Sequence, residues 1–221
     1  GEARQAMDPD FKRWFMQWMR GKNVYLVTGS DRAKTVEQIG QDLVDRCTMS
    51  FQCAGNSVWQ NGVAVSSTKL NVPPEMIHFL EEKVAATSYP DLYGNHIEIR
   101  PGLINFSIVG RNAVGNQRDD YYIWDQKHKE REQIAKDFNN RFIGFEAEVG
   151  GKTSLDIHLK GRNKAQVYDV IGSPLVFFGD RIFPGGNDYP LHCRMIDPQD
   201  KSHPVTSASE TWNLLREYYN E

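Results

Sequence analysis

The chain has 221 residues, a formal net charge of −3, 39% hydrophobic residues and 25% charged residues. This length is enough for one large domain or two small ones, and the lack of a basic surplus argues against a general nucleic-acid-binding protein. No uninterrupted apolar run reaches about 18 residues, so neither a transmembrane helix nor a membrane partner is expected.

The cysteines Cys47, Cys53 and Cys193 are odd in number and form no Cys-x-x-Cys pair. A disulfide framework or a zinc site is therefore not expected, and a reducing cytoplasm is the default location. The first residues, Gly1 to Gln5, do not resemble a signal peptide, and the chain does not begin with Met. We therefore expect a cytoplasmic protein and interpret the chain as a fragment.

The N-terminal part predicts a helix, a strand and a second helix. Asp8 and Pro9 suit the N-cap and the first position of a helix that Gly21 is expected to end. An apolar strand follows over residues 24–27, and a second helix over residues 34–46. Aromatic residues recur at helical spacing in the first helix and predict a buried stripe: Phe11, Trp14, Phe15 and Trp18.

The middle of the chain indicates two antiparallel hairpins, because short alternating segments come in pairs joined by glycine-containing turns. The first pair is residues 96–100 and 103–109, and the second is residues 145–149 and 154–159. A charged helix is predicted between them over residues 125–142. Helices combined with antiparallel hairpins favour a separate α+β domain.

The last part of the chain returns to an α/β pattern. A helix ending near residue 171 leads into an apolar strand over residues 174–178, and a final helix is predicted over residues 207–219. The predicted fold class is therefore α/β with an insertion. We predict a core made of residues 1–63 and 163–221, interrupted by an α+β domain over residues 64–162.

Two carboxylates follow the apolar strand at residues 174–178. Asp180 comes shortly after it, and a glycine-rich turn brings Asp188 back beside Asp180. Carboxylates at the carboxyl end of a buried strand suit Mg²⁺, which prefers oxygen ligands and usually serves phosphate chemistry. The alternative is a β-turn with solvated acids, since Gly-Gly and Asn-Asp mark turns in any fold.

Basic residues of the inserted segment suit an anion. Arg100, Arg111 and Arg118 lie near strand ends, and each guanidinium presents a planar fork of donors to a phosphate. Ser154 and Asp156 alternate along their strand, so their side chains share a face from which they could contact sugar hydroxyls. The alternatives are ordinary surface arginines and the polar face of a half-buried sheet.

Three further polar residues lie near the starts of helices. Lys164 could neutralise a phosphorylated intermediate beside Mg²⁺. Thr28 and Ser30 lie at a strand-to-helix turn, where hydroxyl and amide groups can hold phosphate oxygens. The alternatives are an ordinary lysine at a helix start and a serine N-cap.

Together these segments resemble the eukaryotic-type phosphomannomutase family, which belongs to the haloacid dehalogenase superfamily and carries a large inserted cap. The resemblance covers nearly the whole chain, and the spacings from Arg100 to Arg111 and from Asp156 to Lys164 also match. Its most specific parts run from Arg100 to Arg111 and from Phe-Phe-Gly-Asp to Pro-Gly-Gly-Asn-Asp. The segments that carry it are residues 27–31, 37–40, 100–111, 150–156 and 177–188.

The resemblance implies a haloacid-dehalogenase-like core and a cap that binds substrate. It also implies Mg²⁺-dependent phosphoryl transfer that interconverts hexose (mannose) 6-phosphate and 1-phosphate through a bisphosphate. The resemblance also implies a hexose bisphosphate activator and a homodimer formed through the cap.

The resemblance also implies residue roles. Lys164 neutralises phosphate, and Thr28 or Ser30 holds the transferring phosphoryl group. Asp180 binds Mg²⁺, with Asp188 at or just behind the metal, and Asp197 belongs to a later cation-binding loop. The implied substrate-binding residues are Arg4, Arg100, Arg111, Arg118, Ser154 and Asp156.

The chain departs from the family in its catalytic turn. The family's nucleophile lies in an Asp-x-Asp-Gly-Thr motif after the first strand, and no such motif occurs here. We expect that turn to fall just before Arg4, so that the first core strand is missing between residues 24–27 and 174–178. The resemblance then implies an inactive fragment of a mutase.

Two alternative functions stay open. Thr28 stands where these mutases usually have glycine, which favours a sugar-phosphate phosphatase of the same superfamily. Cationic residues without a nucleophile favour a non-catalytic sugar-phosphate-binding protein.

Overall fold

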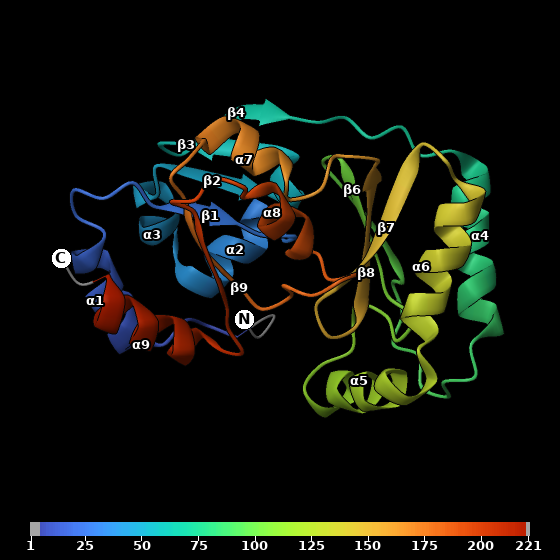
Figure 1. Ribbon diagram of the computed structural model, residues 1–221. Coiled ribbons are helices and arrows are strands. Elements are labelled where there is room, and N and C mark those ends of the chain that lie inside the picture. The colour runs from blue at the N-terminus through green and yellow to red at the C-terminus, as the bar shows by residue number, and fades with distance from the viewer. Residues whose placement is uncertain (1–4, 220–221) are drawn as a thin grey trace.

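The structure is a computed structural model that describes residues 5–219, so the predicted substrate-binding residue Arg4 lies outside the described residues. Figure 1 shows two lobes side by side. We call the lobe that holds α1 to β4 and α7 to α9 the core, and the lobe that runs from α4 to β8 the cap. Among residues 5–219, no helix has both the length and the apolar character that crossing a membrane requires.

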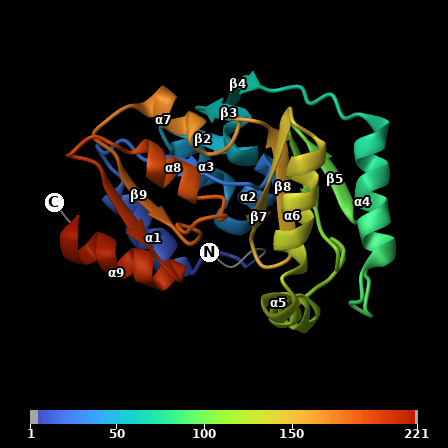
Figure 2. The ribbon, with the colours of Figure 1, turned by 45° about the vertical axis from the view of Figure 1, so that its right-hand side comes forward.

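The cap is built on an antiparallel sheet with the strand order β5–β6–β8–β7. Helices α4 and α6 cover one face of this sheet, and the opposite face is turned toward the core (Figures 1 and 2). The elements are α4 (Pro74–Ala86), β5 (Ile97–Arg100), β6 (Leu103–Phe106), α5 (Asn116–His128), α6 (Glu130–Arg141), β7 (Phe145–Gly150) and β8 (Ser154–Leu159).

Strict alternation along β6 and β8 separates the two faces of the cap sheet. Apolar residues on one face join the side chains of α4 and α6 in a single buried cluster, which includes Ile104, Phe106, Leu155 and Ile157. The residues between them, such as Asn105 and Asp156, therefore face the core. Both predicted hairpins are confirmed, and their polar face is the one that meets the other lobe.

The core contains two separate sheets. One has the order β1–β2–β3–β4, with β1 parallel to β2, and the other pairs β9 with β10 in parallel. Its strands are β1 (Tyr25–Val27), β2 (Met49–Gln52), β3 (Ser57–Gln60), β4 (Val63–Ser67), β9 (Val176–Gly179) and β10 (Lys201–Pro204). Its helices are α1 (Pro9–Trp18), α2 (Arg32–Ile39), α3 (Gln41–Arg46), the short 3₁₀ helix η1 (Cys53–Gly55), α7 (Gln166–Ile171), α8 (Tyr189–Arg194) and α9 (Ala208–Tyr218).

Strands β1 and β9 are edges of different sheets. Within residues 5–219, no ladder of hydrogen bonds joins β1 to β9. This agrees with the expectation that residues 24–27 and 174–178 are not direct neighbours in one sheet.

Two predicted helices are each divided in the structure. The expected helix over residues 34–46 is α2 followed by α3, because Gly40 has φ +88° between them. The expected helix over residues 125–142 is the end of α5 followed by α6, which meet at Lys129 with φ +57°. A left-handed residue ends a helix because the next amide can no longer reach the carbonyl four residues back.

The core sheet extends beyond the expected boundary at residue 63. Strand β4 pairs with β3 through Ser67, so this strand belongs to the first core sheet. Its alternation is weak, and all of its residues are exposed, which explains why the sequence pattern did not reveal it.

The aromatic stripe of α1 packs against α9, and the two helices lie side by side (Figure 1). Asp8 caps α1 by accepting hydrogen bonds of 2.9 Å from the amides of Asp10 and Phe11. The ring of Phe11 stacks on that of Trp212 with centroids 5.1 Å apart. The sequence prediction of a capped helix is therefore confirmed for α1, and the aromatic stripe is confirmed in part, because Phe11 is buried while Trp14, Phe15 and Trp18 are half-buried.

We expect the Phe11→Ala variant to lower the free energy of unfolding by about 3 kcal/mol, because it removes a buried ring and leaves a cavity against Trp212. Urea unfolding followed by tryptophan fluorescence measures this loss. The control Ile143→Ala changes a side chain that is 82% exposed and should stay within about 0.5 kcal/mol of the parent. Equal losses in the two variants would contradict the packing of α1 on α9.

Candidate active site between cap and core

The polar face of the cap sheet meets two loops of the core. One loop follows β1 and contains Gly29, whose carbonyl accepts a 2.9 Å hydrogen bond from Nη1 of Arg100. The other follows β9 and contains Asn187, whose Nδ2 donates to Oδ2 of Asp156 over 3.0 Å. The chain therefore brings residues from the cap sheet and from both core loops to one place.

Glu98 lies at the centre of the basic residues in this region. Its carboxylate accepts hydrogen bonds from Arg100 at 3.0 and 3.2 Å, from Arg111 at 2.9 Å and from Lys34 at 2.5 Å. Burial alone would raise the pKa of Glu98, but the hydrogen bonds from Arg100 and Lys34 outweigh it and lower the pKa. Arg118 is buried in the first turn of α5.

Asp156 is 4% exposed and lies between cap and core. Its Oδ1 accepts a 2.7 Å hydrogen bond from Asn105 on the neighbouring strand, while its Oδ2 accepts from Asn187. A Cβ atom added to Gly29 would lie 2.9 Å from Oδ2, and one added to Gly150 would lie 2.7 Å from it. Both glycines are therefore required by the close approach of the backbone to this carboxylate.

A buried arginine orders the turn between β7 and β8. Nη1 of Arg131 donates to the carbonyls of Gly150, Gly151 and Ser154 at 2.9, 3.1 and 3.3 Å. The arginine is in turn paired with Asp125, whose Oδ2 lies 2.8 Å from its Nε. This network holds the start of β8, and so the positions of Ser154 and Asp156 on its polar face.

Lys164 and Asp188 form a buried ion pair in the core, 6% and 4% exposed, with 2.6 Å between Nζ and Oδ1. Burial would lower the pKa of Lys164, but the charge of Asp188 outweighs it, so the pKa is raised. Burial would likewise raise the pKa of Asp188, and the charge of Lys164 lowers it instead. Both groups are therefore charged at neutral pH.

Asp180 and Asp188 together suit a hard cation. Asp180 is exposed, and its side chain hydrogen-bonds with Asp188. Two neighbouring carboxylates need a proton or a cation to offset their repulsion, and oxygen ligands of this kind fit Mg²⁺. Because Asp188 already accepts from Lys164 and from the backbone amide of Arg181, Asp180 is the better placed to bind the ion directly.

The structure does not bring Asp197 to this place. Asp197 precedes β10, and β10 runs parallel to β9, so Asp197 lies at the opposite end of this sheet from Asp180. Its Oδ1 accepts a hydrogen bond from the amide of Gln199, which makes it part of a local turn. Asp197 therefore does not join Asp180 and Asp188, and its membership of a later cation-binding loop stays a prediction.

Thr28 and Ser30 lie in the loop after β1, beside the glycine that touches Asp156. Oγ1 of Thr28 accepts a 3.1 Å hydrogen bond from the amide of Ser30. The N-cap of α2 is Asp31, which accepts from the amide of Lys34 at 2.8 Å, so the alternative of a Ser30 N-cap is wrong.

Sequence reasoning missed five polar residues of the site: Lys34, Glu98, Asn105, Arg131 and Asn187. Glu98 and Asn105 had a usable signal, because each lies on a predicted strand at a position that shares a face with Arg100 or Asp156. Arg131 lies in a helix with many charged residues, where nothing in the pattern marks it as buried.

Comparisons with known proteins point to one family. The chain matches the family described as eukaryotic phosphomannomutase over residues 12–221. It is 30% identical to phosphomannomutase 1 of Dictyostelium discoideum, covering 99% of this chain and 92% of that protein. It is 28% identical to the phosphomannomutase of Arabidopsis thaliana, covering 94% of this chain and 87% of that protein.

Solved structures agree on the fold. An N-terminal truncated IMP-nucleotidase of Plasmodium falciparum superimposes with a TM-score of 0.64 at 15% identity, covering 99% of this chain and 67% of that chain. The fold is therefore of the haloacid dehalogenase type, with a cap inserted into the core. Within that class, the chain belongs to the eukaryotic phosphomannomutase family.

We expect the Glu98→Gln variant to be less stable than the parent near neutral pH. A carboxylate with a lowered pKa in the folded state stabilises the fold above its ordinary pKa of about 4.3, and this contribution is lost as the pH falls toward the folded-state pKa. The difference in unfolding free energy between parent and variant should therefore shrink below about pH 4. Urea unfolding over a pH series measures it.

The matched control for this series is Glu132→Gln, which removes an exposed carboxylate paired with Lys129 on one helix. Exposed pairs of this kind contribute little to stability. A difference for Glu98→Gln that stays constant with pH, or that equals the difference for Glu132→Gln, would contradict the role of Glu98.

The Lys164→Met variant should lose about 3 kcal/mol of stability, because it leaves the buried charge of Asp188 without its partner. The double variant with Asp188→Asn should lose less than the sum of the two single losses, since the two residues act as one pair. Urea unfolding of the four proteins measures this coupling, and strictly additive losses would contradict the pairing.

Proposed function

We propose that the chain binds a hexose phosphate between cap and core, at a site for Mg²⁺-dependent phosphoryl transfer between the 6- and 1-positions of a hexose such as mannose. The observation that carries the proposal is the convergence of Lys34, Arg100 and Arg111 on the single carboxylate of Glu98. Lys34 and Arg100 also lie 3.6 and 3.8 Å from Oδ2 of Asp31, so three cations face two carboxylates and leave a surplus of positive charge that attracts a phosphate.

The chemistry of a mutase explains why the cap needs such a site. The sugar must turn round so that either end can meet the reacting group, and its far phosphate has to stay bound meanwhile. Arg100 and Arg111 are proposed to hold that far phosphate, with Arg118 further along the cap. Ser154 and Asp156, on the same polar face, are proposed to accept or donate hydrogen bonds to sugar hydroxyls.

The core residues are proposed to serve the reacting phosphate. Lys164 offsets negative charge there, and its buried pair with Asp188 keeps the ammonium in place. Thr28 or Ser30 would donate a hydroxyl hydrogen bond to a phosphoryl oxygen from the loop after β1. Asp180, with Asp188 behind it, would hold Mg²⁺, which when bound draws charge from phosphate oxygens.

The nucleophile is not assigned to any residue of the chain, because the 221 residues contain no Asp-x-Asp-Gly-Thr motif. Substrate binding is therefore the property that these residues can be tested for directly. A hexose bisphosphate activator and a dimer formed through the cap remain predictions from the family.

We expect the chain to bind mannose 1-phosphate in the presence of Mg²⁺, and the Arg111→Ala variant to bind it about tenfold or more weakly, because a charge-assisted hydrogen bond is lost. Titration calorimetry measures both affinities. The control Arg13→Ala removes an exposed guanidinium of α1, where it pairs with Asp10, and should leave the affinity unchanged. No saturable binding, or equal weakening by both variants, would overturn the proposal.

A turnover assay separates the functions that binding alone leaves open. With mannose 1-phosphate, a hexose bisphosphate and Mg²⁺, we expect isomerisation by the 221-residue chain to be slower by orders of magnitude than in a complete mutase, since a missing nucleophile disables the whole catalytic unit. Fast isomerisation would contradict this expectation. Release of inorganic phosphate without isomer would indicate a phosphatase instead.

A further inference from the structure

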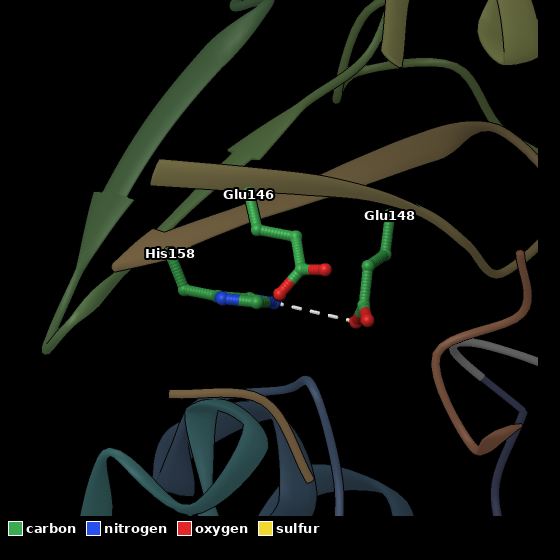
Figure 3. Close-up of side chains that lie close together, drawn as sticks. All are labelled: Glu146, Glu148 and His158. Atoms are coloured by element: carbon green, nitrogen blue, oxygen red, sulfur yellow. Dashed lines mark hydrogen bonds and ion pairs between the residues drawn. The ribbon is translucent and has the colours of Figure 1, made fainter. Parts of the chain in front are cut away.

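A second group of metal-ligating side chains lies on the polar face of the cap sheet, beside the proposed substrate site. Glu146 and Glu148 come from β7, and His158 comes from β8 directly opposite Glu146. The three side chains point to the same side of the sheet and converge (Figure 3). Their potential ligand atoms all lie within 4.8 Å of one another.

The imidazole of His158 is oriented for binding an ion. Its Nδ1 lies 3.1 Å from the carbonyl oxygen of Leu159, which can only accept, so we assign the ring proton to Nδ1. This leaves the lone pair of Nε2 directed at Oε2 of Glu148, 3.3 Å away. A backbone carbonyl that fixes the tautomer in this way is the usual partner of a metal-binding histidine.

Two acceptors that face each other at this distance repel unless a positive charge lies between them. His158 is 0% exposed, so water does not screen the contact. Glu146 and Asp156 add further negative charge next to Glu148. The cluster therefore needs either an added proton or a cation. A proton on the imidazole of His158 supplies one positive charge, whereas Glu146 and Glu148 together carry two negative charges.

We propose that Glu146, Glu148 and His158 bind a Zn²⁺ ion that is separate from the Mg²⁺ site at Asp180. One imidazole nitrogen and two carboxylate oxygens are ligands that Zn²⁺ accepts, and three protein ligands leave a fourth position open. Mg²⁺ prefers oxygen ligands alone, so the imidazole selects against it. The open position lies on the face of the sheet that also carries Asp156.

The test is Zn²⁺ binding by the 221-residue protein in the presence of excess Mg²⁺, measured by titration calorimetry and by the absorption bands of Co²⁺ used in its place. We expect one ion per chain and tetrahedral Co²⁺ bands. Glu146→Gln and Glu148→Gln should each weaken Zn²⁺ binding by at least about tenfold, because losing even an outer partner of a metal ligand has an effect of that size.

The matched control is Glu82→Gln, which alters another glutamate next to a histidine. Glu82 and His78 form a 3.2 Å pair on the exposed surface of α4. Among residues 5–219, no third metal-ligating side chain joins this pair. Circular dichroism of each variant shows whether it is folded. Glu146 is partly exposed, so Glu146→Gln tests metal binding without disturbing the packing around buried His158.

The outcomes are distinct. The proposal is overturned if the folded parent binds no Zn²⁺, which would indicate that a proton alone occupies the cluster. It is also overturned if Glu146→Gln and Glu148→Gln bind as tightly as the parent, or if Glu82→Gln removes the binding. Mannose 1-phosphate binding through Arg111 is measured separately, so its failure would leave the Zn²⁺ result intact.

Discussion

The carboxylate of Asp156 is the contact on which the relation between the two lobes depends. One oxygen is fixed within the cap by Asn105, and the other accepts from Asn187 of the core. Two glycines are needed for the backbone to come this close to it. Asn187 precedes Asp188, so the contact also links the cap to the buried Lys164–Asp188 pair. A side chain that we propose contacts sugar hydroxyls thus also joins cap and core, as do the contacts of Arg100 with Gly29 and of Lys34 with Glu98.

Opposite charges at the site are balanced by partners within the chain. Glu98 offsets Arg100 and Arg111 of the cap together with Lys34 of the core, and Asp188 offsets Lys164 in the core. Such pairs lose hydration when they form, and their attraction compensates for it only in good geometry. A bound phosphate would take over contacts that the cations make with carboxylates. Because phosphate and carboxylate are both negative, the cations would need little rearrangement. The site is in this sense preorganised for anions.

Much of this arrangement was predictable from the sequence. The two hairpins of the cap, the helix after Asp8 and the polar faces that carry Arg100 and Asp156 follow from periodicity, and the placing of Asp188 beside Asp180 follows from the glycine-rich turn. Other features depend on contacts between distant segments, which periodicity does not encode. Gly40 and Lys129 divide helices through a single backbone angle, and the burial of Arg131 depends on three carbonyls of a turn some twenty residues away in the chain. Glu98 was overlooked because a carboxylate in an alternating strand looks like a solvated residue until its partners are known.

Division of the core into two sheets affects the local stability of its strands. Strands β6 and β8 are paired on both sides within the cap, whereas β1 and β9 are each paired on one side among residues 5–219. Backbone amides of an edge strand exchange with solvent through smaller local openings than those of a central strand. We therefore expect the two lobes to differ in local stability: β1 and β9, which precede the core loops of the candidate site, should exchange amide hydrogen for deuterium sooner than β6 and β8 in the middle of the cap sheet.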